Sequence, residues 1–183
     1  MSAKIAAKNP ETELAFEMMS VHVPEAVAEL FAGYDLPVCP STNEVASTTI
    51  EREVAASIGF TATKMRGVLM LKASEASITR WLDAMGMAGG DLPDTLSEFS
   101  NMLLGRIKGR LLREGLPITL ATPTATAGSG LRFSVPPGES VCRAFEGNDW
   151  SITVRMDATF EADFAIDPTA VEDAAEAGEC ILF

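Results

Sequence analysis

Histidine is nearly absent from this chain of 183 residues, and its cysteines follow no motif. The single histidine is His22, and the three cysteines (Cys39, Cys142 and Cys180) have no Cys-x-x-Cys spacing. Structural zinc needs about four closely spaced Cys or His ligands, so no zinc site can be written from this sequence. A catalytic triad would have to use His22, for which a surface or core-edge position is the simpler interpretation. The odd cysteine count fits a reducing compartment.

Positive charge and long apolar runs are also scarce. The chain has 14 Lys and Arg against 26 Asp and Glu, which gives a net charge of −12. This balance argues against nucleic acid as a partner, because a phosphate-backbone binder needs a basic face. No run approaches the roughly 20 apolar residues of a membrane-spanning helix, and the first residues contain no apolar signal region. We therefore expect a cytoplasmic protein with no membrane partner.

Apolar residues are plentiful enough for one hydrophobic core. They make up 47% of the chain and charged residues 22%, which is typical of a soluble globular protein. We expect a flexible leader over residues 1–20, a single domain over 21–168 and an acidic tail over 169–183. The last four residues, Cys-Ile-Leu-Phe, match the letters of a prenylation box. The residues that precede this box are acidic rather than basic, which favours an unmodified tail instead.

Hydrophobic periodicity and turn residues predict an α/β fold of the α+β type, in which helices cover a mainly antiparallel sheet. Helices are expected over 23–36, 75–87 and 91–115, and strands over 49–62, 66–74, 118–123, 130–136, 140–147 and 150–166. The first helix is expected to start near Pro24, and the sequence Thr-Ala-Gly-Ser-Gly at 126–130 is expected to be a turn.

The helix over 91–115 carries two opposed stripes. At about 100° per residue, one apolar stripe falls within roughly 120° of arc and is predicted to be buried: Leu96, Phe99, Leu103, Ile107 and Leu111. Asp94, Glu98, Asn101 and Gly105 fall on the opposite side and are predicted to face solvent. Gly105 costs about 1 kcal/mol relative to alanine in a helix interior, and it would let another surface approach closely.

This helix resembles the signature helix of the CheC/CheX/FliY family of response-regulator phosphatases. The family pattern is Asp or Ser, three residues, Glu, two residues, Asn, and then a Pro after about 22 residues. Here the pattern is Asp94, Glu98, Asn101 and Pro123, with 21 residues between the last two. The resemblance covers about 40 residues. Because only one Glu-x-x-Asn occurs, the chain is most similar to the CheX type, which carries one motif and forms homodimers.

The resemblance implies a phosphatase that hydrolyses the aspartyl phosphate of a phosphorylated, CheY-like receiver domain in chemotaxis or two-component signalling. Asn101 would position the attacking water, and Glu98 would dock on a lysine of the receiver. Asp94 would contact the partner at the rim of the site, and Gly105 would keep the helix face low. The enzyme would need no metal or cofactor of its own, because the receiver supplies Mg²⁺.

Two alternatives use the same residues. The chain could be a non-catalytic receiver-binding module, like those of flagellar switch proteins, although such a module has no need of the Asn101 amide. It could also be an unrelated α/β domain in which Glu-x-x-Asn occurs by chance, in which case Asn101 would be expected in a buried interface. Exposed strands such as 140–147 favour a homodimer that pairs across sheet edges.

Overall fold

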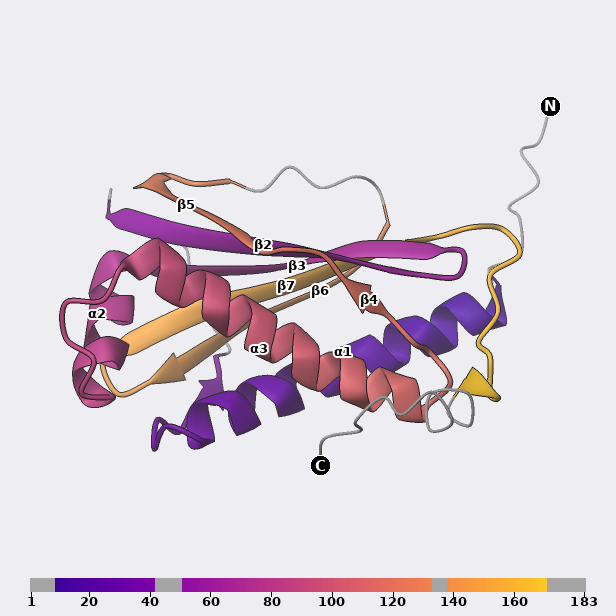
Figure 1. Cartoon of the computed structure of the whole chain (residues 1–183), viewed down its shortest axis with the longest axis horizontal. Coiled ribbons are helices and arrows are strands. Elements are labelled where there is room, and N and C mark those ends of the chain that lie inside the picture. The colour runs from indigo at the N-terminus through magenta and orange to yellow at the C-terminus, as the bar shows by residue number, and fades with distance from the viewer. Residues whose placement is uncertain (1–8, 42–50, 133–137, 171–183) are drawn as a thin grey trace.

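The computed structural model describes residues 9–41, 51–132 and 138–170. Within these residues, seven strands form one antiparallel sheet, and three helices lie against one of its faces (Figure 1). The helices are α1 (Pro10–Ala32), α2 (Glu75–Ala84) and α3 (Leu92–Arg113). The expected fold class is therefore confirmed. None of these helices is long and apolar enough to cross a membrane.

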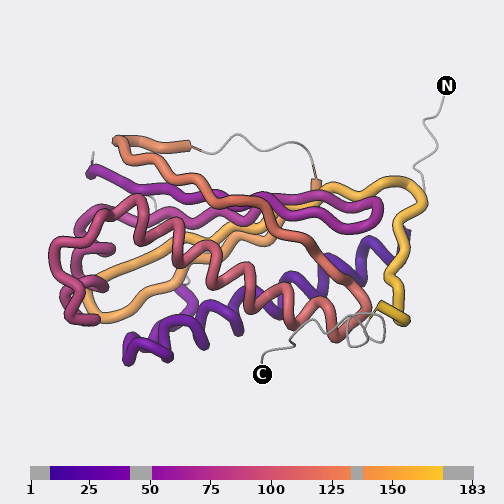
Figure 2. Tube along the Cα trace, in the orientation of Figure 1, coloured from indigo at the N-terminus to yellow at the C-terminus, as the bar shows by residue number. Residues whose placement is uncertain are grey.

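The sheet has the strand order β1-β6-β7-β3-β2-β4, and β5 also pairs with β2. Its strands are β1 (Cys39–Pro40), β2 (Arg52–Ala62), β3 (Met65–Ser74), β4 (Thr119–Leu120), β5 (Thr124–Ser129), β6 (Glu139–Gly147) and β7 (Trp150–Phe160). Helices α1 and α3 run side by side beneath this sheet, as the chain trace also shows (Figure 2). The sequence pattern predicts β2, β3 and β7 as strands, and their long antiparallel pairing in the structure confirms this prediction.

The core lies between the sheet and the helices. Every second residue of β7, from Trp150 to Ala158, is buried as its alternating pattern predicts. At one end of the molecule, aromatic rings from four elements pack together: Phe31 of α1, Trp81 of α2, Phe99 of α3 and Trp150 of β7. The ring centroids of five contacting pairs among them lie 4.8–5.8 Å apart. Such contacts add to area burial and fix the helices against the sheet.

The first helix is longer than the sequence pattern indicated, and the predicted leader is wrong over residues 10–20. Helix α1 begins at Pro10, where the Asn9 side chain accepts a hydrogen bond from the backbone N–H of Glu11. Ala15 and Met19 are buried in the core. Pro24 lies inside the helix rather than at its start. Core packing along α1 therefore offsets the hydrogen bond that a proline cannot donate. Residues 1–8 lie outside the described chain.

The segment expected to be a turn at 126–130 is largely strand β5, so that expectation is wrong. Residues 124–129 pair with 52–57 of β2, and this long-range partner outweighs the local turn composition. Three residues, 121–123, lie between β4 and β5, whereas the matching stretch of β2 has only two residues, 58 and 59. The extra residue is a bulge that accommodates Pro123, which has no N–H for the ladder. The strand expected over 130–136 lies partly outside the described residues, as do residues 171–183 with Cys180.

Gly67 of β3 offers a test of this sheet. A Cβ added at Gly67 would collide with the Phe60 ring and with the backbone oxygen of Asp157, whereas one added at Gly59 would lie an ordinary 3.6 Å from the Ala121 side chain. We expect Gly67→Ala to lower the free energy of unfolding by about 1–3 kcal/mol, because a packed core tolerates added volume poorly. Gly59→Ala is the control and should change it by less than about 0.5 kcal/mol. Urea unfolding measures both, and equal effects would contradict the packing described.

Candidate functional site

Helix α3 has well-defined ends, which hold its exposed face in a fixed position. At its start, the Asp91 side chain accepts a hydrogen bond of 2.8 Å from the backbone N–H of Asp94. At its end, Gly115 has a positive φ of 79°, and the Leu116 N–H donates to the Leu111 carbonyl. This arrangement is a Schellman cap, and it confirms the helix end predicted at Gly115.

The two predicted stripes of α3 lie as expected. Leu96, Phe99, Leu103, Ile107 and Leu111 are all buried against the sheet and α1. Asp94, Glu98, Asn101 and Gly105 are all exposed on the opposite side. The structure thus brings the four predicted site residues together on one solvent-facing strip of about three helical turns. Their roles in binding and catalysis stay predictions.

Glu98 and Asn101 are available to an external partner. Neither side chain has a hydrogen bond or an ion pair within the described chain. The two lie one turn apart, so their polar groups can contact the same partner group. A Cβ added at Gly105, the next turn along, would meet nothing within 4 Å. The strip therefore presents a carboxylate and a neutral amide beside an unobstructed stretch of helix backbone.

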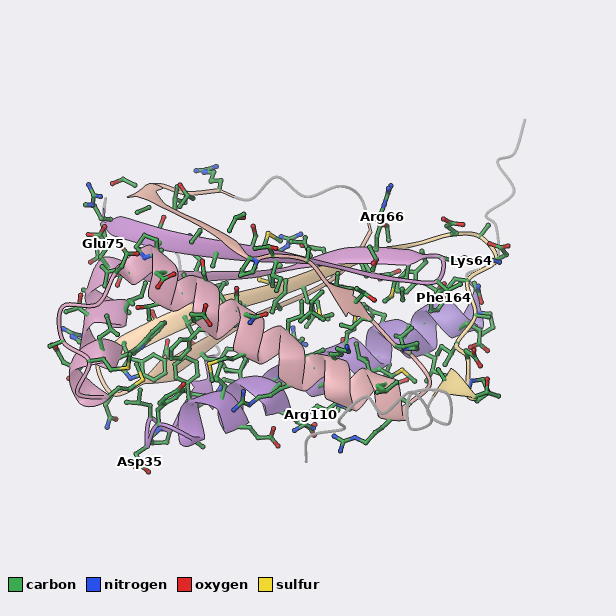
Figure 3. The ribbon with its side chains drawn as sticks, in the orientation of Figure 1. Asp35, Lys64, Arg66, Glu75, Arg110 and Phe164 are labelled. Carbon is green, nitrogen blue, oxygen red and sulfur yellow. The ribbon has the colours of Figure 1, made fainter. Side chains whose placement is uncertain are left out.

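The C-terminal half of α3 is fastened to α1 by charged side chains. Arg110 bonds to Glu25 and to Glu29 of α1, with a distance of 2.6 Å in each case, and it lies beside α1 in Figure 3. His22 lies within α1 and is 9% exposed, with Nε2 3.0 Å from a carboxylate oxygen of Glu114. His22 is therefore part of the α1–α3 contact, in line with the core-edge interpretation of the sequence.

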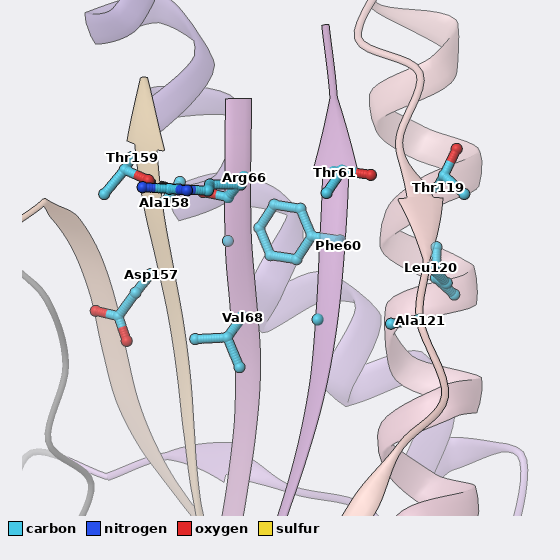
Figure 4. Close-up of a pocket in the computed structure, with 12 residues that line it drawn as sticks. Phe60, Thr61, Arg66, Val68, Thr119, Leu120, Ala121, Asp157, Ala158 and Thr159 are labelled. Atoms are coloured by element: carbon cyan, nitrogen blue, oxygen red, sulfur yellow. Dashed lines mark hydrogen bonds between the residues drawn. The ribbon is translucent and has the colours of Figure 1, made fainter. Parts of the chain in front are cut away.

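A separate pocket of about 380 Å³ opens on the sheet, where β4, β2, β3 and β7 run side by side (Figure 4). Its walls are mainly apolar, and its buried carboxylate, Asp157, is held by two-atom hydrogen bonding to Arg155. That bond raises the pKa of the Arg155 guanidinium above its ordinary value. Asp157 is the one carboxylate among the pocket's lining residues and is already paired, and no histidine or cysteine lines the pocket. The exposed strip of α3 is therefore the better candidate site.

Metal ligands do not gather anywhere in the described ranges. No group of three or more His, Cys, Asp or Glu side chains among these residues could hold a metal ion. In particular, Asp94 and Glu98 on α3 belong to no such group within the described residues.

The fold and the exposed Glu-x-x-Asn helix define the class: an α/β protein whose polar site is carried by one helix face. The family model described as "Chemotaxis phosphatase CheX" matches residues 54–146, a range that runs from β2 to β6 and includes all of α3. The chain therefore belongs to the CheX family, within the wider CheC/CheX/FliY group. A search of curated protein sequences found no match.

Solved structures share the fold at low sequence identity. The chemotaxis protein CheX from Vibrio vulnificus has a TM-score of 0.67 at 17% identity, covering 78% of this chain and 99% of the other. CheX from Desulfovibrio desulfuricans has a TM-score of 0.64 at 21% identity, with the same coverage. CheX in a CheX–CheY–BeF3–Mg²⁺ complex from Borrelia burgdorferi has a TM-score of 0.59 at 13% identity, covering 82% of this chain and 99% of that one.

Sequence reasoning missed the residues that flank the strip on the α1 side. A hollow there is lined by Glu29 of α1 and by residues of α3: Met102, Gly105, Arg106, Gly109, Arg110 and Arg113. Two signals in the sequence could have found it. Gly105 and Gly109 are four residues apart, and the arginines at 106, 110 and 113 recur at helical spacing. The contribution of Glu29 depends on how α1 packs and could not have been found in this way.

Proposed function

We propose that this protein is a phosphatase that hydrolyses the aspartyl phosphate of a CheY-like receiver domain in chemotaxis or two-component signalling. Family membership supports the class of activity. The single observation that carries the assignment to a site is the pair Glu98 and Asn101, exposed and unpartnered on a rigid helix. The Borrelia burgdorferi structure is a complex of CheX with CheY, BeF3 and Mg²⁺, and a complex of the same kind is proposed for this chain.

The reaction needs little beyond a correctly placed water. The water oxygen bonds to phosphorus as the bond between phosphorus and the aspartate oxygen breaks. The products are dihydrogen phosphate, which keeps both water protons, and the free carboxylate. Phosphoryl transfer of this kind depends mainly on in-line positioning and on neutralising charge. The receiver's own Mg²⁺ and lysine would supply the neutralisation, so this chain would contribute no metal.

Asn101 suits the positioning role because an amide offers one acceptor oxygen and two donor hydrogens and does not titrate. It can therefore hold a water in one orientation at any physiological pH. Glu98 would make a charge-assisted hydrogen bond to the receiver's lysine and so set where the helix docks. Asp94, at the first turn of α3, would contact the rim of the partner, while Gly105 would let the partner's backbone come close.

Replacing Glu98 tests the docking role. We expect Glu98→Ala to raise the Kd for a phosphorylated receiver about tenfold and to slow its dephosphorylation as well, because a charge-assisted contact acts before and during the reaction. The free energy of unfolding should change by no more than about 0.5 kcal/mol, since the residue is exposed. Glu17→Ala, which removes an exposed acid of α1, is the control. Identical Kd values for both variants and the wild type would refute the docking role.

A cytoplasmic homodimer is proposed as the working form. Within the described residues, the outer edge of β6 is paired with β1 at Phe145 and Glu146, and the Ala144 carbonyl accepts a hydrogen bond from the Ser41 N–H. The stretch of this edge from Val141 to Arg143 is proposed to pair with a second chain, as exposed strand edges tend to do. Sedimentation at micromolar concentration would contradict this proposal if it returned a monomer of 19.4 kDa.

A further inference from the structure

The hollow beside the strip, here named the arginine groove, is formed by Glu29, Met102, Gly105, Arg106, Gly109, Arg110 and Arg113. It has a volume of about 880 Å³ and runs along α3 where that helix meets α1. At about 100° per residue, Gly109 continues the line of Asn101 and Gly105, and the arginines lie on the α1 side of that line. The arginine groove is therefore continuous with the proposed reaction site.

The charge of the arginine groove is opposite to that of the whole protein. The chain carries −12, yet the groove contains three of its 14 basic residues. Arg110 is neutralised by Glu25 and Glu29, and Glu29 is the one acid among the groove's lining residues.

Arg106 and Arg113 keep their charge available. Within the described chain, the only hydrogen bond of the Arg106 side chain is the one it donates to the Met102 carbonyl, at 3.4 Å, and neither arginine has a carboxylate partner there. Two uncompensated positive charges thus remain, about 10 Å apart along the helix.

The floor of the groove is kept low by glycine. A Cβ added at Gly105 or Gly109 would meet nothing within 4 Å, and neither residue has a positive φ. No packing or backbone requirement inside the described chain therefore explains these glycines, although each weakens a helix relative to alanine. Their effect is to leave depth in a positively charged groove next to Asn101.

We propose that the arginine groove binds an acidic surface segment of the receiver domain, with carboxylates facing Arg106 and Arg113. This inference rests on the proposed function. The occupant follows from position and charge. Gly109 lies about 12 Å along the helix from Asn101, so a domain docked on Asn101 extends over the groove. Charge complementarity would then select among receivers, favouring those that carry acids at this position.

The test is a charge reversal with a matched control. Arg106→Glu/Arg113→Glu is compared with Arg66→Glu/Arg80→Glu, which makes the same change in net charge at exposed positions on β3 and α2. Binding is measured by calorimetry to a receiver activated with beryllofluoride and Mg²⁺, at low and high salt. We expect the groove variant to raise Kd about tenfold at low salt and less at high salt, with the control within about twofold of wild type. The rate at saturating receiver should stay within about twofold of wild type.

Each other outcome is decisive. An unchanged Kd for the groove variant, or an equal rise in the control, overturns the proposal. So does a change in sedimentation without a change in Kd, which would assign the groove to a second copy of this chain. Arg106→Gln/Arg113→Gln replaces the reversal if that variant unfolds, with a smaller rise in Kd expected. Wild-type protein that binds the receiver without hastening phosphate release would refute the proposed function alone. Absence of binding would refute both proposals.

Discussion

Asn101→Ala is expected to lower the rate of receiver dephosphorylation by about 100-fold or more, because losing the geometry of a reacting water has effects of this size. Its Kd for the phosphorylated receiver should stay within about threefold of wild type, since the amide acts on the transition state rather than the bound ground state. Stability should change by less than about 0.5 kcal/mol at this exposed position. Phosphate release under single-turnover conditions measures the rate, and calorimetry measures the affinity.

Two further variants are compared with Asn101→Ala. Asn101→Asp keeps the shape of the side chain but replaces donors with a negative charge, so it should be as slow as Asn101→Ala. Asn148→Ala removes an exposed amide from the turn between β6 and β7 and should leave the rate near that of wild type. If Asn101→Ala retained the wild-type rate, the water-positioning role would be wrong.

Gly105→Leu is expected to separate stability from function. The added side chain meets open space, and leucine is the better helix former, so the free energy of unfolding should rise by up to about 1 kcal/mol. Docking should nevertheless weaken by about tenfold or more, and the dephosphorylation rate should fall with it, because the side chain occupies the approach of the partner beside Asn101. Thermal unfolding and calorimetry on the same sample give both quantities.

A leucine substitution on another helix serves as the control for Gly105→Leu. Glu17→Leu places the same side chain at an exposed position of α1, outside both the strip and the arginine groove. It should leave the Kd for the phosphorylated receiver near that of the wild type. A variant Gly105→Leu that is more stable and binds as well as wild type would show that the partner does not approach this face.

The parts of the fold that could be predicted are those in which local pattern and final packing agree. The stripe from Leu96 to Leu111 has helical spacing, and Gly115 followed by Pro117 ends the helix. The same holds for β7, whose alternation matches its burial. Where pairing with a segment distant in the sequence determines the local structure, the sequence-based prediction is wrong. Strand β5 has a turn-like composition and becomes a strand because β2 pairs with it.

The start of α1 was mispredicted for a different reason. Pro24 was interpreted as a start signal, while the stronger signal was Asn9 followed by Pro10, with acids in the first turn. A few residues of this segment, Ala15 and Met19 among them, are buried in the core. Glutamates stand among them in the sequence, so the segment shows no clear apolar pattern. The exposed strip of the candidate site needed only the helical wheel and was predicted correctly as a surface. The arginine groove could not be predicted from the sequence, because α1 supplies one of its walls.

A multiple-turnover assay measures the proposed phosphatase activity itself. A phosphorylated receiver is mixed with one-fiftieth of its concentration of this protein, and the aspartyl phosphate is followed over time. We expect every receiver molecule to be dephosphorylated faster than it decays alone, with dozens of turnovers per chain, and we expect Asn101→Ala to remove the acceleration. A wild-type protein that binds the phosphorylated receiver yet leaves its lifetime unchanged would contradict the proposed activity and identify a non-catalytic docking module.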